Sequence, residues 1–323
     1  MNLQQKLIAN LQQTNVLSQK GLIEMFDSTI GRSTVLMPFG GKTQRSESQV
    51  SVQKIPVGNH FTNTASMMAY GYNPDISLWS PYHGAQYAVI EAITKIVAAG
   101  GRYNNIRFSF QEYFEKMTQN PFSWGKPTAA LLGALQMQHD FKLPAIGGKD
   151  SMSGTFQDIN VPPMLMAFGI TKVDANNVIS TDLKAVGNNI YFIGHCHNDD
   201  FTPNVEQLKK NYDFISQEIE NQNIVAAWAV GFGGVAEAIC KMAFGNEIGV
   251  FLEQRQEEIT EEDLFNLSYG SIVVETPKEL DYERAVFLGK TISEKVIQIN
   301  SEEVDLETLY KANTEKFAEI YPI

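Results

Sequence analysis

The segment Pro144-Ala-Ile-Gly-Gly-Lys-Asp-Ser-Met-Ser153 decides how the fold is interpreted, because it joins a short apolar run to a glycine turn in the middle of the chain. A helix is predicted just before it, over residues 126–139, which carry Leu131, Leu132 and Leu135 at helical spacing. The segment therefore stands where a helix gives way to an extended run and a turn, and such alternation is typical of an α/β architecture.

The same alternation extends outward in both directions. The clearest helix covers residues 81–99, where Val89, Ile93 and Ile96 lie on one apolar stripe and a glycine pair follows. The other predicted helices cover residues 3–11, 204–220, a segment beginning near 233, and 305–318. The predicted strands cover residues 33–39, 49–57, 65–70, 164–170, 189–194, 249–253, 271–276 and 296–299. We expect a domain boundary near the prolines 162–163, with domains over residues 1–160 and 161–323 and α/β structure in both.

The composition is that of a globular protein. The 323 residues carry a formal net charge of −12, with 43% hydrophobic and 19% charged residues. An acidic chain lacks the basic face that coating a nucleic acid or an anionic membrane requires, so neither partner is expected. No run of about 18 apolar residues occurs, and residues 1–6 lack the start of a signal peptide, so a cytoplasmic location is expected. Cys196 and Cys240 show no CxxC spacing, which argues against a disulfide scaffold or a zinc ribbon.

Two glycine clusters are candidates for phosphate binding. The stretch from Gly147 to Ser153 holds backbone amides, the Lys149 ammonium, the Asp150 carboxylate and the Ser151 hydroxyl, which together suit a magnesium–phosphate site. The alternative is a surface turn that Asp150 caps. Gly233 and Gly234 open a predicted helix, where glycines allow either the approach of a phosphate or close helix–sheet packing.

The remaining ionisable residues give weaker signals. Glu91 lies beside the apolar stripe of the helix 81–99, so its carboxylate is either a cation ligand or an edge residue that faces solvent. The tract 195–197, His-Cys-His, is the only metal-like cluster, but adjacent residues point in different directions, and we expect it to end the strand 189–194. Neither cysteine has a nucleophile's setting and no GxSxG motif occurs, so no catalytic residue is assigned.

Six segments occur in a fixed order, namely residues 26–31, 35–41, 80–85, 91–96, 144–153 and 224–243. Together they resemble the large-type phosphoribosylformylglycinamidine synthase family of purine biosynthesis. The match is to the second of the family's two aminoimidazole-ribonucleotide-synthetase-like halves, and it covers nearly the whole chain. The resemblance implies a two-domain α/β (α+β) fold, with an N-terminal barrel-forming domain and a C-terminal α/β domain that meet over a nucleotide cleft.

The resemblance also implies a ligase activity of the whole enzyme. Formylglycinamide ribonucleotide, ATP and glutamine would be converted to the amidine, with Mg²⁺ and ATP or ADP as cofactors and an iminophosphate that ammonia displaces. The chain matches neither the first synthetase half nor the glutaminase domain. These parts are the implied partners, and we expect the isolated chain to lack activity and to self-associate through its barrel face.

The family's site residues are only partly kept. Lys149, Asp150 and Ser151 match the family motif fully, and Glu91 matches a helix carboxylate that binds magnesium. Lys95 stands where the family usually has an Asn ligand. In residues 228–234 the glycines, including Gly233 and Gly234, are kept, whereas the polar ligands are replaced, with Ala229 in place of an Asp.

We therefore expect the cleft of this half to have lost its metal-bound nucleotide, or to hold it weakly with Lys95 in place of the ion. The function of the half is then architectural. Two alternatives stay open from the sequence: a scaffold half that binds partner domains and no nucleotide, and a stand-alone ATP-binding relative such as aminoimidazole ribonucleotide synthetase or thiamine-phosphate kinase.

Overall fold

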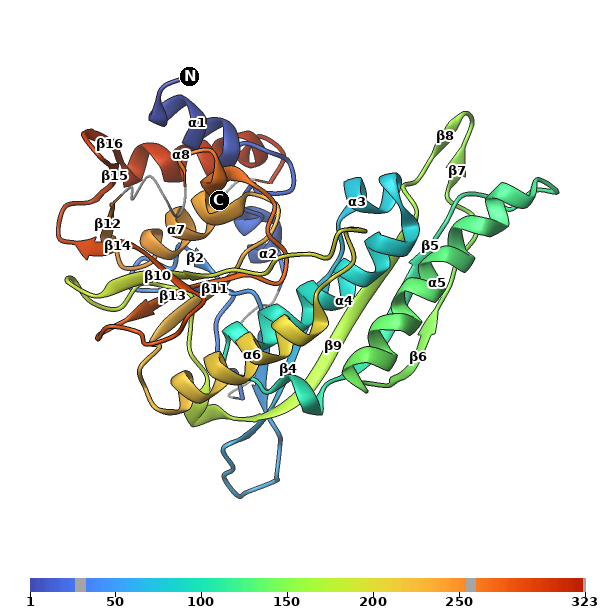
Figure 1. Ribbon diagram of the computed structural model, residues 1–323, viewed down its shortest axis with the longest axis horizontal. Coiled ribbons are helices and arrows are strands. Elements are labelled where there is room, and N and C mark those ends of the chain that lie inside the picture. Colours follow the sequence, from blue (N-terminus) through green and yellow to red (C-terminus); the bar gives the residue numbers. More distant parts are fainter. Residues whose placement is uncertain (27–32, 254–259, 322–323) are drawn as a thin grey trace.

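The computed structural model describes residues 1–26, 33–253 and 260–321, and within them the chain builds two large sheets with helices between and around them (Figure 1). Of the segment 26–31 that contributes to the family resemblance, residues 27–31 lie outside this described part. The mixed α/β fold class expected from the sequence is confirmed.

The first sheet has five strands in the order β3-β4-β9-β5-β6. The strands are β3 (Ser51–Lys54), β4 (Thr64–Gly71), β9 (Met164–Asp174), β5 (Arg107–Tyr113) and β6 (Ala145–Lys149). All neighbours are antiparallel except β5 and β6, which are parallel. Along β4, buried and more exposed residues alternate, so only one face of the sheet is covered.

The second sheet has seven strands in the order β11-β13-β10-β14-β12-β15-β16. They are β10 (Asn189–Ile193), β11 (Ala226–Ala229), β12 (Gly249–Leu252), β13 (Ile272–Thr276), β14 (Ala285–Ile292), β15 (Val296–Ile299) and β16 (Glu302–Asp305). Its helices are α6 (Val205–Glu220), α7 (Gly234–Phe244) and α8 (Leu306–Ala318). The N-terminal helix α1 (Leu3–Leu11) packs against α7 and α8, so the first residues of the chain belong to this layer.

Apart from the two long helices α4 (Pro81–Ala98) and α5 (Pro121–Phe141), the remaining elements are short. They are α2 (Lys20–Glu24), α3 (Pro74–Trp79), three single-turn helices (Tyr103–Asn105, Ala175–Asn177, Asp263–Phe265), and the paired strands β1 (Phe39–Gly40) with β2 (Ser46–Glu47) and β7 (Thr155–Phe156) with β8 (Ile159–Asn160).

Helix α4 (Pro81–Ala98) lies at the centre of the molecule and confirms the clearest helix that the sequence predicts. The Ser80 side chain caps its first turn, and Pro81 takes the first helical position, where a missing amide costs nothing. The helix packs on β4, β9, α5 (Pro121–Phe141) and α6 and also contacts β11. It therefore joins the two sheets.

Several expected elements differ from the structure. A strand over 33–39 is wrong, because only residues 39–40 form a strand there, apart from one isolated bridge at Thr34. The sequence predicts none of the strands β5, β11, β14 and β16, nor the short strands β2, β7 and β8. Strand β9 begins after the prolines 162–163 and lies in the middle of the first sheet, and the division into domains 1–160 and 161–323 stays a prediction.

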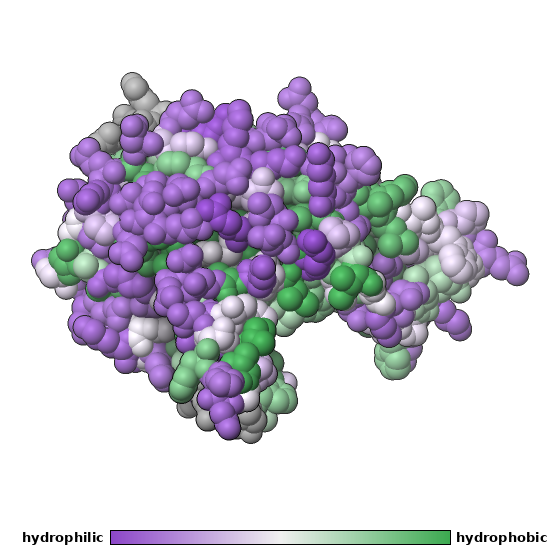
Figure 2. Space-filling model, turned by 90° about the horizontal axis from the view of Figure 1, so that it is seen from below, coloured by the Kyte–Doolittle hydropathy of each residue, from purple (hydrophilic) through white to green (hydrophobic). Residues whose placement is uncertain are grey.

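Hydrophobic side chains remain exposed on the part of the molecule that holds the first sheet. In Figure 2 hydrophobic groups gather in the right half and at the lower centre, whereas the left part is mostly hydrophilic. The exposed residues of that part include Trp124, Leu131, Leu132, Leu135, Ile146, Phe156, Ile159 and Ile170. None of the helices in the described residues is both long and apolar enough to cross a bilayer.

Candidate functional site

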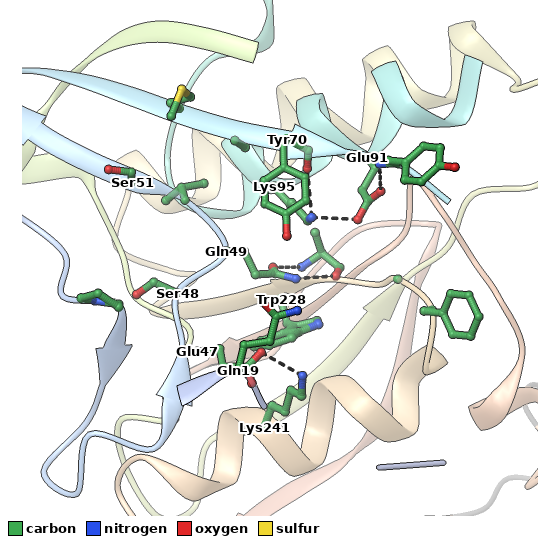
Figure 3. Close-up of a pocket in the computed structure, with 18 of the residues that line it drawn as sticks. Gln19, Glu47, Ser48, Gln49, Ser51, Tyr70, Glu91, Lys95, Trp228 and Lys241 are labelled. Carbon is green, nitrogen blue, oxygen red and sulfur yellow. Dashed lines mark hydrogen bonds and ion pairs between the residues drawn. The ribbon is translucent and has the colours of Figure 1, made fainter. Parts of the chain in front are cut away.

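A cleft of about 820 Å³ opens between the first sheet and the edge of the second sheet that β11 forms (Figure 3). Strands β4 and β9 provide one wall, and β11 with α7 provides the other. The segment that leads into β3 lines the space between them, with Glu47 and Gln49. We treat this cleft as the candidate site because acidic and basic side chains from both sides of it line the same space.

Glu91 and Lys95 meet in this cleft as an ion pair. They stand four residues apart on α4, and the Lys95 Nζ lies 2.7 Å from Glu91 Oε1. The other Glu91 oxygen accepts a hydrogen bond from the Tyr72 amide at 2.9 Å, and the Lys95 ammonium donates to the Tyr70 carbonyl at 3.0 Å. The ammonium also lies 4.5 Å from the centre of the Tyr70 ring.

Burial alone would lower the pKa of Lys95, but the Glu91 carboxylate, helped by Tyr70 and Glu237, outweighs that effect and leaves the pKa above its ordinary value. The lysine therefore stays charged, and its charge is neutralised by a partner in the same cleft.

A second ion pair network forms across the cleft around Lys241. Its Nζ lies 2.8 Å from Glu47 Oε2 and 3.0 Å from Glu237 Oε1, and its side chain is only 4% exposed. The two carboxylates outweigh the effect of burial and raise the pKa of Lys241. The ammonium also lies 5.7 Å from the centre of the Trp228 ring.

Gln49 ties the loop before β3 to the edge of the second sheet. Its Nε2 donates to the Ala229 carbonyl at 2.9 Å, and its Oε1 accepts from the Ala229 amide at 2.8 Å. Ala229 ends β11, which is an edge strand with backbone groups that no neighbouring strand pairs. The amide of Gln49 thus takes the place of a further strand, at a position where the resemblance would put a metal-binding Asp.

The glycines at the start of α7 serve packing in this chain. Gly234 has φ +68°, and a Cβ there would lie 2.6 Å from the Leu264 carbonyl oxygen. The Gly233 amide, which would face a phosphate, donates instead to Glu237 Oε2 at 2.8 Å. The carboxylate of the helix itself therefore occupies the position of an anion at this N-terminus.

The structure separates the predicted site residues into two places. Glu91 and Lys95 line the cleft, and Gly233 directly follows one of its lining residues, Phe232. Lys149 and Asp150 are exposed at the end of β6, the edge strand farthest from β3, and they do not line the cleft. Ser151 is half-buried there, and its carbonyl accepts a hydrogen bond from the Phe114 amide.

The tract 195–197 ends β10, as the sequence predicts. His195 shares a hydrogen bond with the Tyr269 carbonyl through Nδ1 and accepts one from the Asn204 amide at Nε2. Both ring nitrogens of His195 are thus occupied by backbone groups, and no group of three or more His, Cys, Asp or Glu that could hold a metal occurs among the residues described.

The cleft residues do not fit the magnesium ion that the resemblance implies. A hard cation needs several oxygen ligands, whereas Glu91 shares its oxygens with an ammonium and a backbone amide. Ala229 provides no side-chain oxygen. We therefore derive no chemical step through a metal in this cleft.

Sequence reasoning missed the ion pair network of Glu47, Glu237 and Lys241 in this cleft, and also Gln49 and Trp228. The four-residue spacing of Glu237 and Lys241 was the available signal, because it predicts an ion pair on a helix. Glu47 and Gln49 gave none, since their partners lie almost two hundred residues away in the chain.

Comparisons of sequence identify relatives that are much longer than this chain. No family model matches it. It is 26% identical over 297 residues to a phosphoribosylformylglycinamidine synthase subunit PurL from Picrophilus torridus, which covers 86% of this chain and 39% of the relative. A PurL subunit from Thermococcus sibiricus is 24% identical over 352 residues, covering 97% of this chain and 46% of the relative. The chain spans less than half the length of these relatives.

Solved structures with the same fold include PurL proteins. Thermotoga maritima PurL complexed with FGAR superposes with a TM-score of 0.70 at 12% identity, covering 96% of this chain and 54% of that one. Thiamine monophosphate kinase from Aquifex aeolicus superposes with a TM-score of 0.56 at 11% identity, covering 78% of this chain and 94% of that one. The synthetase-like fold expected from the sequence is thereby confirmed. In sequence the chain is related to PurL subunits, and it has the fold that their solved structures share.

Proposed function

We propose that this chain is one synthetase-like half of a phosphoribosylformylglycinamidine synthase, the ATP- and glutamine-dependent ligase that makes the formylglycinamidine ribonucleotide of purine biosynthesis. The observation that carries the proposal is the sequence likeness to PurL over 86% of the chain but only 39% of the relative. A half of this kind completes an enzyme whose catalytic cleft lies in the other half.

The role of this half is architectural. Its cleft has lost the oxygen ligands that a metal-bound nucleotide needs, and the two lysines that line it are each held by carboxylates. Structures with the same fold are complexed with ADP and ATP. In this chain we propose that such a nucleotide binds weakly or not at all.

The partners follow from the same proposal. The first synthetase half packs against the open face of the five-stranded sheet, and a glutaminase supplies ammonia. A structure named PurLQS shares the fold, which supports an assembly of several parts. Lys149, Asp150 and Ser151 lie at the β6 edge, and we propose that they act on phosphate only where a second half adjoins that edge.

The test is an ammonia-dependent assay of ADP release with formylglycinamide ribonucleotide, ATP and Mg²⁺. The purified chain alone is expected to show no turnover, and turnover is expected when the first synthetase half encoded in the same genome is added. Both proteins should then elute together in size-exclusion chromatography. Turnover by the chain alone, or two halves that elute separately without activity, would contradict the proposal.

Calorimetric titration with ADP, with and without Mg²⁺, tests the architectural role. The wild-type chain is expected to show no tight Mg²⁺-dependent binding. The double substitution Lys95→Asn and Ala229→Asp adds oxygen ligands to the cleft that Glu91 lines, and it is expected to raise the affinity for Mg–ADP. Tight Mg²⁺-dependent binding by the wild type would show that the cleft has kept its nucleotide.

A stand-alone kinase is the second candidate, because the thiamine monophosphate kinase fold matches this chain over 94% of that enzyme's length. The same assay with thiamine monophosphate and ATP separates the two. We expect no ADP release, since the cleft holds no free cation for a phosphoryl group among its described residues.

A further inference from the structure

The charged side chains of the cleft are all engaged with one another. Among the described residues that line it, the carboxylates are those of Glu47, Glu91 and Glu237, and the ammonium groups are those of Lys95 and Lys241. Each ammonium is within 3.0 Å of at least one carboxylate. Negative charge is in excess, and the Oε1 of Glu47 has no hydrogen-bond donor. A phosphate entering this cleft would therefore meet repulsion rather than a free cation.

The walls of the same cleft are rich in aromatic and sulfur-containing side chains. Tyr70 and Phe168 stand on neighbouring strands of the first sheet, are register partners, and have ring centres 6.3 Å apart. Tyr70 is 50% exposed. Met68 and Met166 lie on the same wall, and Trp228 lies on the opposite side. Exposed aromatic faces bind planar rings by stacking, whether or not the ring carries a charge.

We propose that this cleft binds a planar heterocycle that carries no negative charge, of the nucleoside class, in place of a metal-bound nucleotide. The volume of about 820 Å³ is large enough for such a ligand, since small-molecule sites typically measure about 300–1,000 Å³. The inference rests on the proposed function in one respect, namely that the metal ligands of the cleft are lost. The remaining surface of the cleft disfavours the binding of a phosphate group and favours the binding of an uncharged planar ring.

The experiment is a titration of the whole chain with adenosine, AMP and ADP, followed by calorimetry and by saturation-transfer NMR of the ligand. Adenosine is expected to bind, and ADP is expected to bind about tenfold or more weakly, because each phosphate adds negative charge to a cleft that already has an excess. Mg²⁺ is expected to leave this order unchanged. ADP binding as tightly as adenosine, or the absence of any adenosine signal, would overturn the proposal.

Substitution of Tyr70, the exposed aromatic residue on the cleft wall, tests where the ligand binds. Tyr70→Ala is expected to weaken adenosine about tenfold, which corresponds to the loss of one aromatic stacking partner. Tyr113→Ala is the matched control, because Tyr113 is a half-buried tyrosine of the same sheet that does not line the cleft. Equal affinities of the two variants for adenosine would place the ligand elsewhere and overturn the assignment.

Substitution of the ion pair tests the selection against phosphate. Glu91→Gln keeps an oxygen for the Tyr72 amide but leaves the Lys95 ammonium without its carboxylate, so ADP is expected to bind at least tenfold more tightly than to the wild type without any metal. The gain is expected to vanish in the double variant Glu91→Gln and Lys95→Met, because no ammonium then remains to attract the phosphates. Unchanged ADP affinity in Glu91→Gln would contradict the inference.

The two proposals fail in different ways. If neither adenosine nor ADP binds, the ligand assignment fails while the architectural role stands. If ADP binds tightly only with Mg²⁺, the architectural role fails as well, because the cleft has then kept its metal-bound nucleotide.

Discussion

At the scale of the residue, His195 illustrates how a metal-like motif becomes part of the backbone framework. Burial is the main reason that its pKa falls from 6.5 to about 4; the nearby His197 lowers it further, and the bond to the Tyr269 carbonyl opposes the fall. The neutral ring bridges the Tyr269 carbonyl and the backbone amide of Asn204, and Asn204 is the N-cap residue of α6. Protonation would remove the acceptor that Asn204 uses.

The stability of the protein should therefore decrease between pH 6.5 and about 4. In this window the unfolded chain binds a proton at His195 and the folded chain does not, so unfolding becomes easier as the pH falls, by up to about 3 kcal/mol. Urea denaturation at a series of pH values measures this slope. His195→Gln is expected to flatten it, whereas His139→Gln, at an exposed histidine, should retain it. Equal slopes in both variants would refute this role of His195.

Lys241 provides a second residue whose removal should be costly. Lys241→Met leaves Glu47 and Glu237 without their common cation, and loss of one partner from a buried pair typically costs about 3–5 kcal/mol. Lys209→Met is the control, because Lys209 pairs on the surface with an exposed Glu206, and such pairs contribute about 0–1 kcal/mol. Chemical denaturation of the two variants compares them, and a loss at Lys241 no larger than at Lys209 would contradict the buried network.

Sequence alone indicates some of these residues and not others. Glu91 and Lys95 stand four apart on a predicted helix, and that spacing is enough to place them side by side. Glu47, which pairs with Lys241, and Gln49, which pairs with Ala229, lie in the segment before β3, and no periodicity connects segments so far apart in the chain. Such contacts follow from the packing of the two sheets, which local patterns do not specify.

At the scale of the element, helices were easier to predict than strands and faces. The helix over 126–139 is confirmed within α5, yet Leu131, Leu132 and Leu135 face solvent while Ala130, Ala134 and Met137 are buried. Apolar residues surround this helix on all sides, so its sequence cannot tell which face packs inward. Strand β5 was missed although it alternates Phe108 and Phe110 with polar residues, because its buried third position is Glu112.

The start of α7 yields a prediction about packing. Gly234→Ala is expected to destabilise the fold by about 1–3 kcal/mol, because φ is +68° and the new methyl group would press on the Leu264 carbonyl. Gly231→Ala serves as the control, since no atom lies within 4 Å of a Cβ at that position. Thermal and urea unfolding measure both variants. Equal stability of the two would mean that α7 can begin without this glycine.

At the scale of the whole molecule, the uncovered face and edge of the five-stranded sheet expose apolar side chains to solvent. Ile146 on the edge strand β6 is 74% exposed and Ile170 on β9 is 38% exposed. A sheet with an open edge and an apolar face is a ready site for pairing with another chain. The chain spans less than half of its PurL relatives, and under the proposed function a second synthetase half would cover this face.

We therefore expect the isolated chain to self-associate through this face at micromolar concentration. The double variant Ile146→Lys and Ile170→Lys should sediment as a monomer, because buried ammonium groups would lack partners in the interface. Lysine makes the net charge of −12 less negative, so dissociation cannot come from increased repulsion between copies. Val186→Lys with Leu267→Lys adds the same charge at exposed apolar positions outside the first sheet and should leave association unchanged. A wild-type chain that sediments as a monomer, or equal dissociation in the two double variants, would show that this face is not the one that associates.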